Sequence, residues 1–393
     1  MRRLMRLAAA AALAIAVLAG ASSSTMAAPP TVAVTAPLAG ATVSGAIRLG
    51  AFAYDDGGVV QVVYYVDGIE VAEDSTAPDW GETWETWGVA NGAHTIVATA
   101  RDHAGNVTAS VGVRFTVANG GDPVQVPPPP QPAGAPRIAV AGDIASEGDG
   151  DEITAGLLDS LNPDLVLTTG DNAYPDATLD EFRTYYEPTW GRYKRITRPV
   201  PGNHDYHQAG ASGYFSYFGA FAGDPRRGYY SYDLGTWHLI ALNSEVPVGE
   251  GSAQLTWLKQ DLAASSATCT LAYWHKPLFT GGSHTDDVTY RPLWEALYDA
   301  DAEVVLNGHD HNYQRMWKMT PLGVHDSMRG IREFIVGTGG RSYYSYRDDS
   351  RRIAGNATAF GVLELTLNDG SYDWRFVPEP GSSYVDAGSQ VCH

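Results

Sequence analysis

Cysteine is scarce in this chain of 393 residues, which contains only Cys269 and Cys392. At most one intramolecular disulfide can therefore form. Because the N-terminus has the features of an export signal, the chain is expected to meet an oxidising compartment. An even pair of cysteines then favours one bridge between the C-terminal tail and the core, and the alternative is two unrelated thiols.

Basic residues are also few, with 26 Lys and Arg against 45 Asp and Glu, for a formal net charge of −19. This balance argues against a nucleic-acid-binding surface and against a polybasic membrane patch. A phosphate group would have to be captured locally. Hydrophobic residues make up 44% and charged residues 18%, which is typical of a packed globular protein long enough for two or three domains.

The N-terminal apolar run, from Leu7 to Leu18, is too short and too rich in small residues for a membrane anchor. Arginines precede it and small residues follow it, which is the pattern of a secretory signal. We expect residues 1–28 to be a signal peptide and the protein to be extracellular or periplasmic, without stable membrane insertion.

Residues 29–119 contain β-rich segments separated by Gly, Asp and Asn turn signals, which predicts a small all-β sandwich. The stretches "AYDDGGVVQVVYYVDGIEV" and "GAHTIVATARDHAGNVTAS" resemble bacterial Ig-like modules. We expect this module to act as a spacer or to contact a cell surface or glycan. The proline run within residues 120–136 predicts an extended, semi-rigid linker.

From residue 137 to 393, apolar strands alternate with helical stretches, including predicted helices at about 151–161 and 179–190. Several strands are too polar on one face to be wholly buried. The pattern predicts an α/β (α+β) domain of two packed mixed sheets flanked by helices.

Polar side chains follow five of these apolar strands at the point where each strand ends. They are Asp143, Asp171, Asn203 with His204, His275, and His309 with His311. Ligand sites of open α/β sheets lie at the carboxyl ends of strands, so these residues are expected to share one crevice. Asp, Asn, His and Tyr without Cys suit iron, zinc or manganese. Two ions about 3.5–4 Å apart need a bridging carboxylate, which Asp171 can supply.

The ordered series "GD…GDNAY…GNHD…WH…GHDH" resembles the calcineurin-like metallophosphoesterases, and specifically their purple acid phosphatase branch, over residues 137–393. The resemblance implies a four-layer sandwich and a binuclear metal centre that hydrolyses phosphomonoesters. It implies that the first metal binds Asp143, Asp171, Tyr174 and His311. The second metal is implied to bind Asp171, Asn203, His275 and His309.

Tyr174 bears on the identity of the first metal. Many members of the wider family carry Asp-x-His near the start and the purple branch carries Asp-x-Gly, whereas this chain has Ala145 at that place. A phenolate from Tyr174 can supply the missing ligand. Such a hard anionic donor favours Fe(III) at the first site, with Fe(II), Zn or Mn at the second. The alternative is that Tyr174 only packs beside the site.

Two histidines are candidates for the proton that the leaving group needs. His204 is adjacent to the predicted ligand Asn203. His284 stands where purple acid phosphatases place a substrate-facing histidine, although the second histidine that often follows is Thr285 here. We expect Asp205 and Asp310 to orient ligand or catalytic histidines, with loop solvation as the alternative.

Further residues have weaker expectations. Tyr313 and Arg315 either shape a phosphate pocket or are structural, and the sequence context of His238 favours a hydrogen-bonded core residue. In "GTGGRSYYSY", Arg341 or a tyrosine is expected to line the entrance.

The resulting hypothesis is a secreted binuclear phosphatase that takes small phosphomonoesters. One alternative is a phosphodiesterase or nucleotidase with the same metal centre. Another, from a different class, is an Ig-type adhesion or carbohydrate-binding protein whose larger domain is a non-catalytic scaffold.

Overall fold

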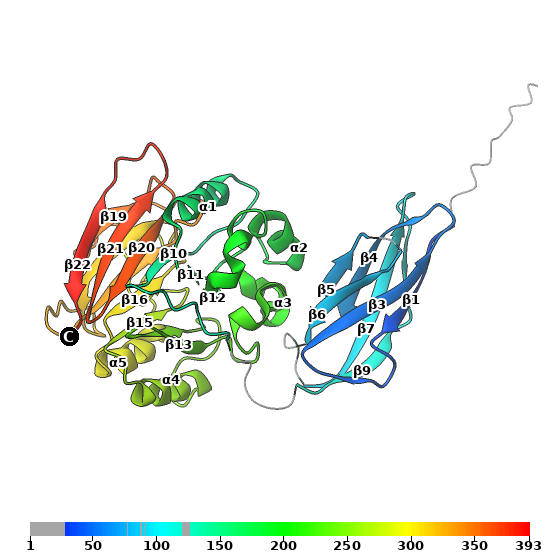
Figure 1. Ribbon diagram of the computed structural model, residues 1–393, viewed down its shortest axis with the longest axis horizontal. Helices are drawn as coiled ribbons and strands as arrows, with labels where there is room; N and C mark the ends of the chain where they lie inside the picture. The colour runs from blue at the N-terminus through cyan, green and yellow to red at the C-terminus, as the bar shows by residue number, and fades with distance from the viewer. Residues whose placement is uncertain (1–27, 77, 87–88, 90, 120–125) are drawn as a thin grey trace, which may run out of the picture.

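The structure is a computed structural model that describes residues 28–393 apart from residues 77, 87–88, 90 and 120–125 (Figure 1). The expected signal peptide lies outside the described residues except for its last position, Ala28. Within the described part of the chain, no helix is long and apolar enough to cross a membrane.

The N-terminal domain is a sandwich of two β-sheets. One sheet has the order β1-β3-β6 and the other β2-β9-β7-β4-β5, with β8 paired to β7. The strands are β1 (Thr31–Ala36), β2 (Thr42–Val43), β3 (Ala46–Tyr54), β4 (Val59–Val66), β5 (Ile69–Asp74), β6 (Gly81–Glu85), β7 (Gly92–Asp102), β8 (Val107–Ala109) and β9 (Val113–Val117). Alternate side chains of the two sheets form one core, in which Trp84 packs edge-on against Phe115.

The described part of the linker lies against the second domain. The Arg198 side chain donates to the carbonyl oxygen of Pro127 at 2.6 Å, and the Gln131 side chain donates to that of Asp233 at 3.2 Å. These contacts anchor the segment that leads into the second domain.

The first sheet of the second domain has the order β12-β11-β10-β20-β21-β22. Its strands are β10 (Arg137–Ala141), β11 (Leu165–Thr169), β12 (Thr197–Val200), β20 (Gly361–Asn368), β21 (Ser371–Pro378) and β22 (Asp386–Val391). Strands β10, β11 and β12 are parallel, and β20 joins β10 in the antiparallel sense.

The second sheet has the order β13-β14-β15-β16-β18-β17-β19. Its strands are β13 (Tyr230–Leu234), β14 (Trp237–Ala241), β15 (Cys269–Tyr273), β16 (Val304–Asn307), β17 (Tyr313–Met319), β18 (Ile331–Val336) and β19 (Arg352–Asn356). Strands β14, β15, β16 and β18 run parallel.

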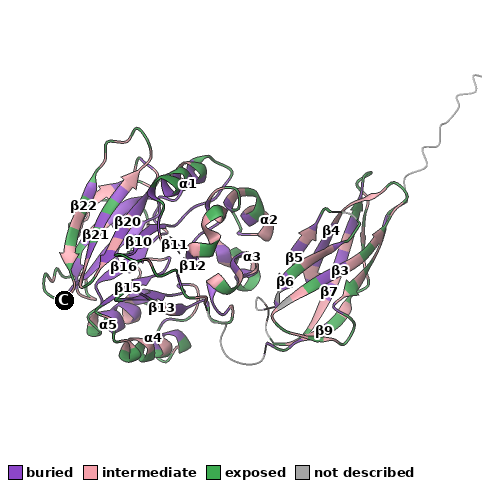
Figure 2. Ribbon diagram, viewed as in Figure 1, coloured by how far each residue is buried: buried purple, intermediate pink, exposed green. Residues whose placement is uncertain are grey.

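The two sheets pack face to face, and helices cover their outer faces, so the predicted four-layer fold is confirmed. Val140 of β10 and Leu271 of β15 belong to one core cluster, which also contains Leu158 of helix α1 (Gly150–Leu161). A second cluster places helices α4 (Ala253–Ala264) and α5 (Arg291–Asp299) against the other face of the second sheet. Figure 2 shows the buried strands between their more exposed helices.

The helix expected at 151–161 is confirmed by α1, but the single helix expected at about 179–190 is wrong. The chain forms α2 (Leu179–Glu181), a π-helix (Phe182–Tyr186) and then a 3₁₀ helix (Trp190–Ile196). The Glu187 N–H donates five residues back, to Phe182. Pro188 has no N–H to continue an α-helical ladder, so the helix changes type and ends.

Short 3₁₀ turns and helix α3 (Ser212–Phe218) follow strand β12. The turns are Asp205–His207, Ala209–Ala211 and Gly219–Ala222, and a further one, Val288–Tyr290, precedes α5. The first of these turns begins directly after the predicted ligand Asn203 and His204.

His238 is the hydrogen-bonded core residue that the sequence predicts. Its ring is buried, with Nδ1 2.8 Å from Asp233 and Nε2 2.9 Å from Asp261. Burial alone opposes its charge, but the hydrogen bonds to Asp261 and Asp233 raise the pKa of His238 above its ordinary value. This histidine belongs to the scaffold.

The expected disulfide between Cys269 and Cys392 is present. The two Cα atoms lie 5.9 Å apart, and the sequence separation of the cysteines is 123. Cys269 is the first residue of β15, and Cys392 directly follows β22. The bridge therefore joins the two sheets.

We predict that Cys392→Ser lowers the free energy of unfolding by about 2–5 kcal/mol, because the unfolded chain loses a long cross-linked loop. Ser389→Ala, an exposed change on the same strand β22, is the control and should be nearly neutral. Denaturant unfolding of both variants measures the difference, and equal midpoints for the two would contradict the prediction.

Candidate metal centre

The site lies at the edge where strands of both sheets end. Asp143, Asp171 and Asn203 follow β10, β11 and β12 of the first sheet, while His275 and His309 follow β15 and β16 of the second. The residues that the sequence predicts to converge are therefore brought together, although they come from two facing sheets rather than from one.

The backbone at three of these residues is left-handed, with φ of 59° at Asp143, 50° at Asp171 and 70° at His309. Non-glycine residues seldom adopt this conformation, and it recurs at functional sites. The neighbouring Gly202 is required because an added Cβ would lie 2.2 Å from the Asp171 carboxylate. Local backbone geometry thus turns each side chain sharply inward as soon as its strand ends.

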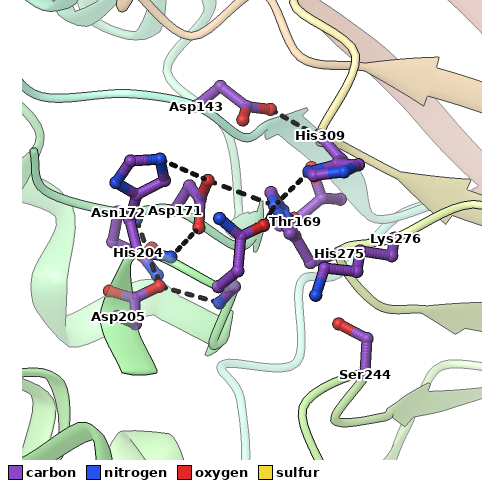
Figure 3. A network of polar contacts seen from close by, with 12 residues as sticks. Asp143, Thr169, Asp171, Asn172, His204, Asp205, Ser244, His275, Lys276 and His309 are labelled. Atoms are coloured by element: carbon purple, nitrogen blue, oxygen red, sulfur yellow. Dashed lines mark hydrogen bonds and ion pairs between the residues drawn. The ribbon is translucent and has the colours of Figure 1, made fainter. Parts of the chain in front are cut away.

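One group of donor atoms surrounds Asp171 on the side of the second sheet (Figure 3). The Nε2 atom of His275 lies 3.2 Å from Asp171 Oδ2, 3.2 Å from Asn203 Oδ1 and 3.2 Å from Nδ1 of His309. Ligand atoms of Asp171, His275 and His309 all lie within 4.8 Å of one another. This spacing is compatible with four donors around one ion.

A second group of donor atoms surrounds Tyr174 on the other side of Asp171. The phenol oxygen of Tyr174 lies 3.0 Å from Asp143 Oδ1, 3.1 Å from Asp171 Oδ2 and 3.3 Å from His311 Nε2. Its hydroxyl thus points at the other predicted ligands of the first metal. This position is compatible with Tyr174 as a metal ligand, which stays a prediction.

Hydrogen bonds fix the orientation of two predicted histidine ligands. His275 Nδ1 donates to the carbonyl oxygen of Thr169 at 2.9 Å, and His311 Nδ1 lies 2.7 Å from the hydroxyl of Ser342. Each ring is thereby held with Nε2 toward the cluster, which is how ligand histidines are usually oriented.

The charges of the cluster suit bound cations. Burial and the charges of Asp143 and Asp171 raise the pKa of Tyr174 well above its ordinary value, so a phenolate here requires a cation to offset the two carboxylates. Burial and the neighbouring imidazoles of His275 and His284 lower the pKa of His309 to about 2, which leaves a neutral ring with a lone pair. Buried carboxylates, neutral imidazole and an amide oxygen together form a donor set for a hard or borderline metal.

The two candidate proton donors flank the cluster from opposite sides. His204 packs against Tyr174 with 4.4 Å between ring centroids and 50° between the ring planes, and its Nδ1 donates to the carbonyl oxygen of Pro175 at 2.5 Å. His284 stacks on His309 at 3.9 Å, with 40% of its side chain exposed. His284 Nδ1 is held by Asp310 at 3.0 Å, so in both histidines Nε2 remains available to a substrate.

The expectation for Asp310 agrees with its contact to His284, but that for Asp205 is wrong. Asp205 accepts from the backbone N–H of Gly202 at 2.8 Å and from the Asn172 side chain at 3.0 Å, and it has no histidine partner among the described residues. It is buried under the Asp171 turn and ties the two ligand-bearing loops together. Adjacent sequence does not reveal such a backbone contact.

Tyr313 and Arg315 also have structural roles. Both side chains bind Asp386 at the start of β22, Tyr313 at 2.6 Å and Arg315 through two hydrogen bonds of 2.7 and 2.8 Å. They join the second sheet to the first and do not shape a phosphate pocket.

The segment after β18 adds a tyrosine to the site, as the sequence predicts, and a serine that the sequence analysis did not name. Besides Ser342, Tyr344 stacks on His311 with 4.0 Å between ring centroids and only 4° between the ring planes. The available signal was "GTGG" directly after an apolar strand, which is a sixth strand end at the same edge.

A pocket of about 330 Å³ adjoins the cluster. It is lined by His309 and His284 together with Lys276, whose ammonium group is paired with Glu245 at 2.9 Å. The pocket is polar, and it opens beside the candidate metal ligands.

Comparisons with known proteins agree with this geometry. Residues 30–98 match the model of the bacterial Ig domain, and residues 136–313 match that of the calcineurin-like phosphoesterases. The chain is 28% identical over 216 residues to purple acid phosphatase 15 of Arabidopsis thaliana, covering 46% of this chain and 40% of that protein. It is 27% identical over 231 residues to human acid phosphatase type 7, covering 51% of each.

Among solved structures, a purple acid phosphatase from yellow lupin seeds has a similar fold. The TM-score is 0.57 at 14% sequence identity, and the match covers 92% of this chain and 74% of that one. The matches to the two phosphatases named above span about half of each relative's length, so they describe a shared core and not a whole protein.

We predict that the chain binds about two equivalents of metal ion and that Asp171→Ala loses most of both, because one carboxylate faces both donor groups. Metal analysis after dialysis measures this. Asp176→Ala, on an exposed carboxylate of the same loop, is the matched control and should retain both equivalents. Full occupancy in Asp171→Ala would show that Asp171 does not bridge.

Proposed function

We propose that this chain is a binuclear metal-dependent phosphatase that hydrolyses small phosphomonoesters in the manner of purple acid phosphatases. The match of residues 136–313 to the model of the calcineurin-like phosphoesterases supports this proposal. The observation that carries the proposal is the position of Asp171 between two groups of donor atoms, with Tyr174 Oη 3.1 Å and His275 Nε2 3.2 Å from its Oδ2 atom. A non-catalytic scaffold gives no reason for seven ligand side chains to remain directed inward.

The seven predicted ligands hold two ions. Asp143, Tyr174 and His311 serve one ion, Asn203, His275 and His309 serve the other, and Asp171 is shared. When bound, such a pair supplies Lewis acidity and activates water for in-line attack on phosphorus. The protein's own contribution is to fix these ligands, exclude competing ones and hold the proton donors in place.

His204 and His284 deliver the proton to the leaving group. Each ring is held through Nδ1, His204 by the carbonyl oxygen of Pro175 and His284 by the Asp310 carboxylate. Each Nε2 can then carry the proton that the departing alkoxide needs. The side chain of His284 is 40% exposed and lines the pocket beside His309, so His284 is the stronger general-acid candidate.

The first ion is Fe(III), and the second is Fe(II), Zn or Mn. The argument rests on Tyr174, whose phenol oxygen lies among anionic donors where ionisation requires a highly charged cation. A hard trivalent ion meets this requirement better than zinc.

Export to the periplasm or the extracellular space is part of the same proposal. The sequence of residues 1–28 has the pattern of a signal peptide, and the Cys269–Cys392 disulfide is stable in an oxidising compartment. The Ig-like module would serve as a spacer or contact a surface or glycan.

The activity test compares p-nitrophenyl phosphate, bis-p-nitrophenyl phosphate and nucleotides with the metal-loaded full chain. We expect p-nitrophenyl phosphate to give the highest kcat/KM and His284→Asn to lower kcat for it by about 10²–10⁴-fold, as loss of a general acid does. His325→Asn, at an exposed histidine in the segment that follows β17, is the control. Higher kcat/KM for the diester would favour the phosphodiesterase alternative, and no hydrolysis of any ester would favour a non-catalytic scaffold.

The metal assignment is tested by the visible spectrum of the protein loaded with iron. We expect a tyrosinate-to-Fe(III) charge-transfer band that disappears in Tyr174→Phe, since only the phenolate oxygen is removed. Tyr344→Phe, whose ring stacks on His311, is the matched control and should keep the band. A colourless protein with two zinc ions would exclude Fe(III) at this site.

A further inference from the structure

A guanidinium group without a counter-ion stands over the candidate metal centre. The side chain of Arg341 lies over the ring of Tyr174, with 5.0 Å between its Cζ atom and the ring centroid. Within the described part of the chain, this side chain forms no hydrogen bond and no ion pair. The nearby Arg347 and Arg351 differ, since carbonyl oxygens or carboxylates bind their guanidinium groups.

The backbone of Arg341 is fixed to the strand end that carries a predicted ligand. Its N–H donates to the carbonyl oxygen of Asp143 at 3.0 Å, and Gly339 donates to that of Gly142 at 2.9 Å. Glycines are required for this approach, because a Cβ at Gly339 would lie 2.4 Å from the Gly142 carbonyl oxygen. The loop is thus held firmly, while the Arg341 side chain itself is exposed to solvent.

The neighbouring cations are already engaged, so a phosphate dianion that enters the site still needs a positive charge to bind. Lys276 in the adjoining pocket is already paired with Glu245, and the guanidinium group of Arg347 donates to the carbonyl oxygens of Gly282 and His284. The chain as a whole carries a formal net charge of −19. A phosphate dianion approaching this surface therefore gains from a local cation, and Arg341 is available to provide it.

We propose that Arg341 binds an unesterified phosphoryl oxygen of a phosphomonoester dianion and thereby makes the site prefer monoesters to diesters. A guanidinium presents a planar fork of N–H donors, which form charge-assisted hydrogen bonds with a phosphate oxygen. A monoester has three non-bridging oxygens, so two can face the metals while one remains for Arg341. A diester has only two, and its second ester group occupies the place of the third. The inference rests on the proposed phosphatase function.

Steady-state kinetics of Arg341→Gln and Arg341→Lys test this role. For Arg341→Gln we expect kcat/KM for p-nitrophenyl phosphate to fall about 10- to 100-fold, as loss of a charge-assisted hydrogen bond does. The fall for bis-p-nitrophenyl phosphate should be about tenfold smaller. Arg341→Lys should recover part of the monoester activity, because it restores the charge without the fork.

The control is Arg329→Gln. Arg329 precedes β18 whereas Arg341 follows it, so the two arginines lie toward opposite ends of the same strand. The Arg329 guanidinium is exposed and paired with Asp301. This variant should retain the wild-type ratio of monoester to diester activity. Equal losses for monoester and diester in Arg341→Gln, with unchanged metal content, would overturn the proposed discrimination.

Binding of inorganic phosphate to the metal-loaded protein, measured by calorimetry, separates this inference from the proposed function. We expect Arg341→Gln to weaken phosphate binding about 10- to 100-fold. If wild-type protein binds phosphate through Arg341 but hydrolyses no ester, the proposed function fails and the phosphate site stands. Unchanged phosphate affinity in Arg341→Gln would refute the site even in an active enzyme.

Discussion

The arrangement depends on two carboxylates, Asp143 and Asp171, that are buried on either side of one tyrosine hydroxyl. Anionic groups taken out of water are costly unless cations or hydrogen-bond donors compensate them. Backbone N–H groups provide part of the compensation, from His204 to Asp171 at 2.8 Å and from His309 to Asp143 at 2.9 Å. The remaining charge calls for bound cations, and the imidazole and amide donors surround the space in which such cations would lie.

The position of each ligand residue at the end of a strand can be predicted from the sequence. A strand end followed by a ligand residue is visible as an apolar run and a polar cluster, and so Asp143, Asp171 and His275 could be located without a structure. The strand pattern also predicted two packed sheets, but it did not show that the ligand residues would come from both of them. Contacts between distant loops were not visible: Asp205 was assigned to a histidine although it holds the backbone of Gly202. The π-helix after residue 181 depends on packing and on Pro188, which periodicity does not report.

Three histidines around the centre are oriented in the same way, through a hydrogen bond at Nδ1. His275, His284 and His311 each engage Nδ1 with a fixed oxygen, of Thr169, Asp310 and Ser342 respectively. The Nε2 atom of each ring can therefore bind a metal ion or carry a proton. His309 is the exception, since its Nδ1 is the atom that faces His275. Its backbone is left-handed, and its ring stacks on that of His284.

The order of strands in the first sheet determines which fragment of the chain can be expressed as a folded unit. The recognisable phosphoesterase segment ends at residue 313, yet β10, which leads to Asp143, is paired on one side with β20 from residues 361–368. A fragment that stops at the last ligand would leave β10 as an open sheet edge beside an uncovered apolar face, a template for intermolecular pairing. The smallest expressible unit is therefore set by the sheet rather than by the ligands, and it extends through β22.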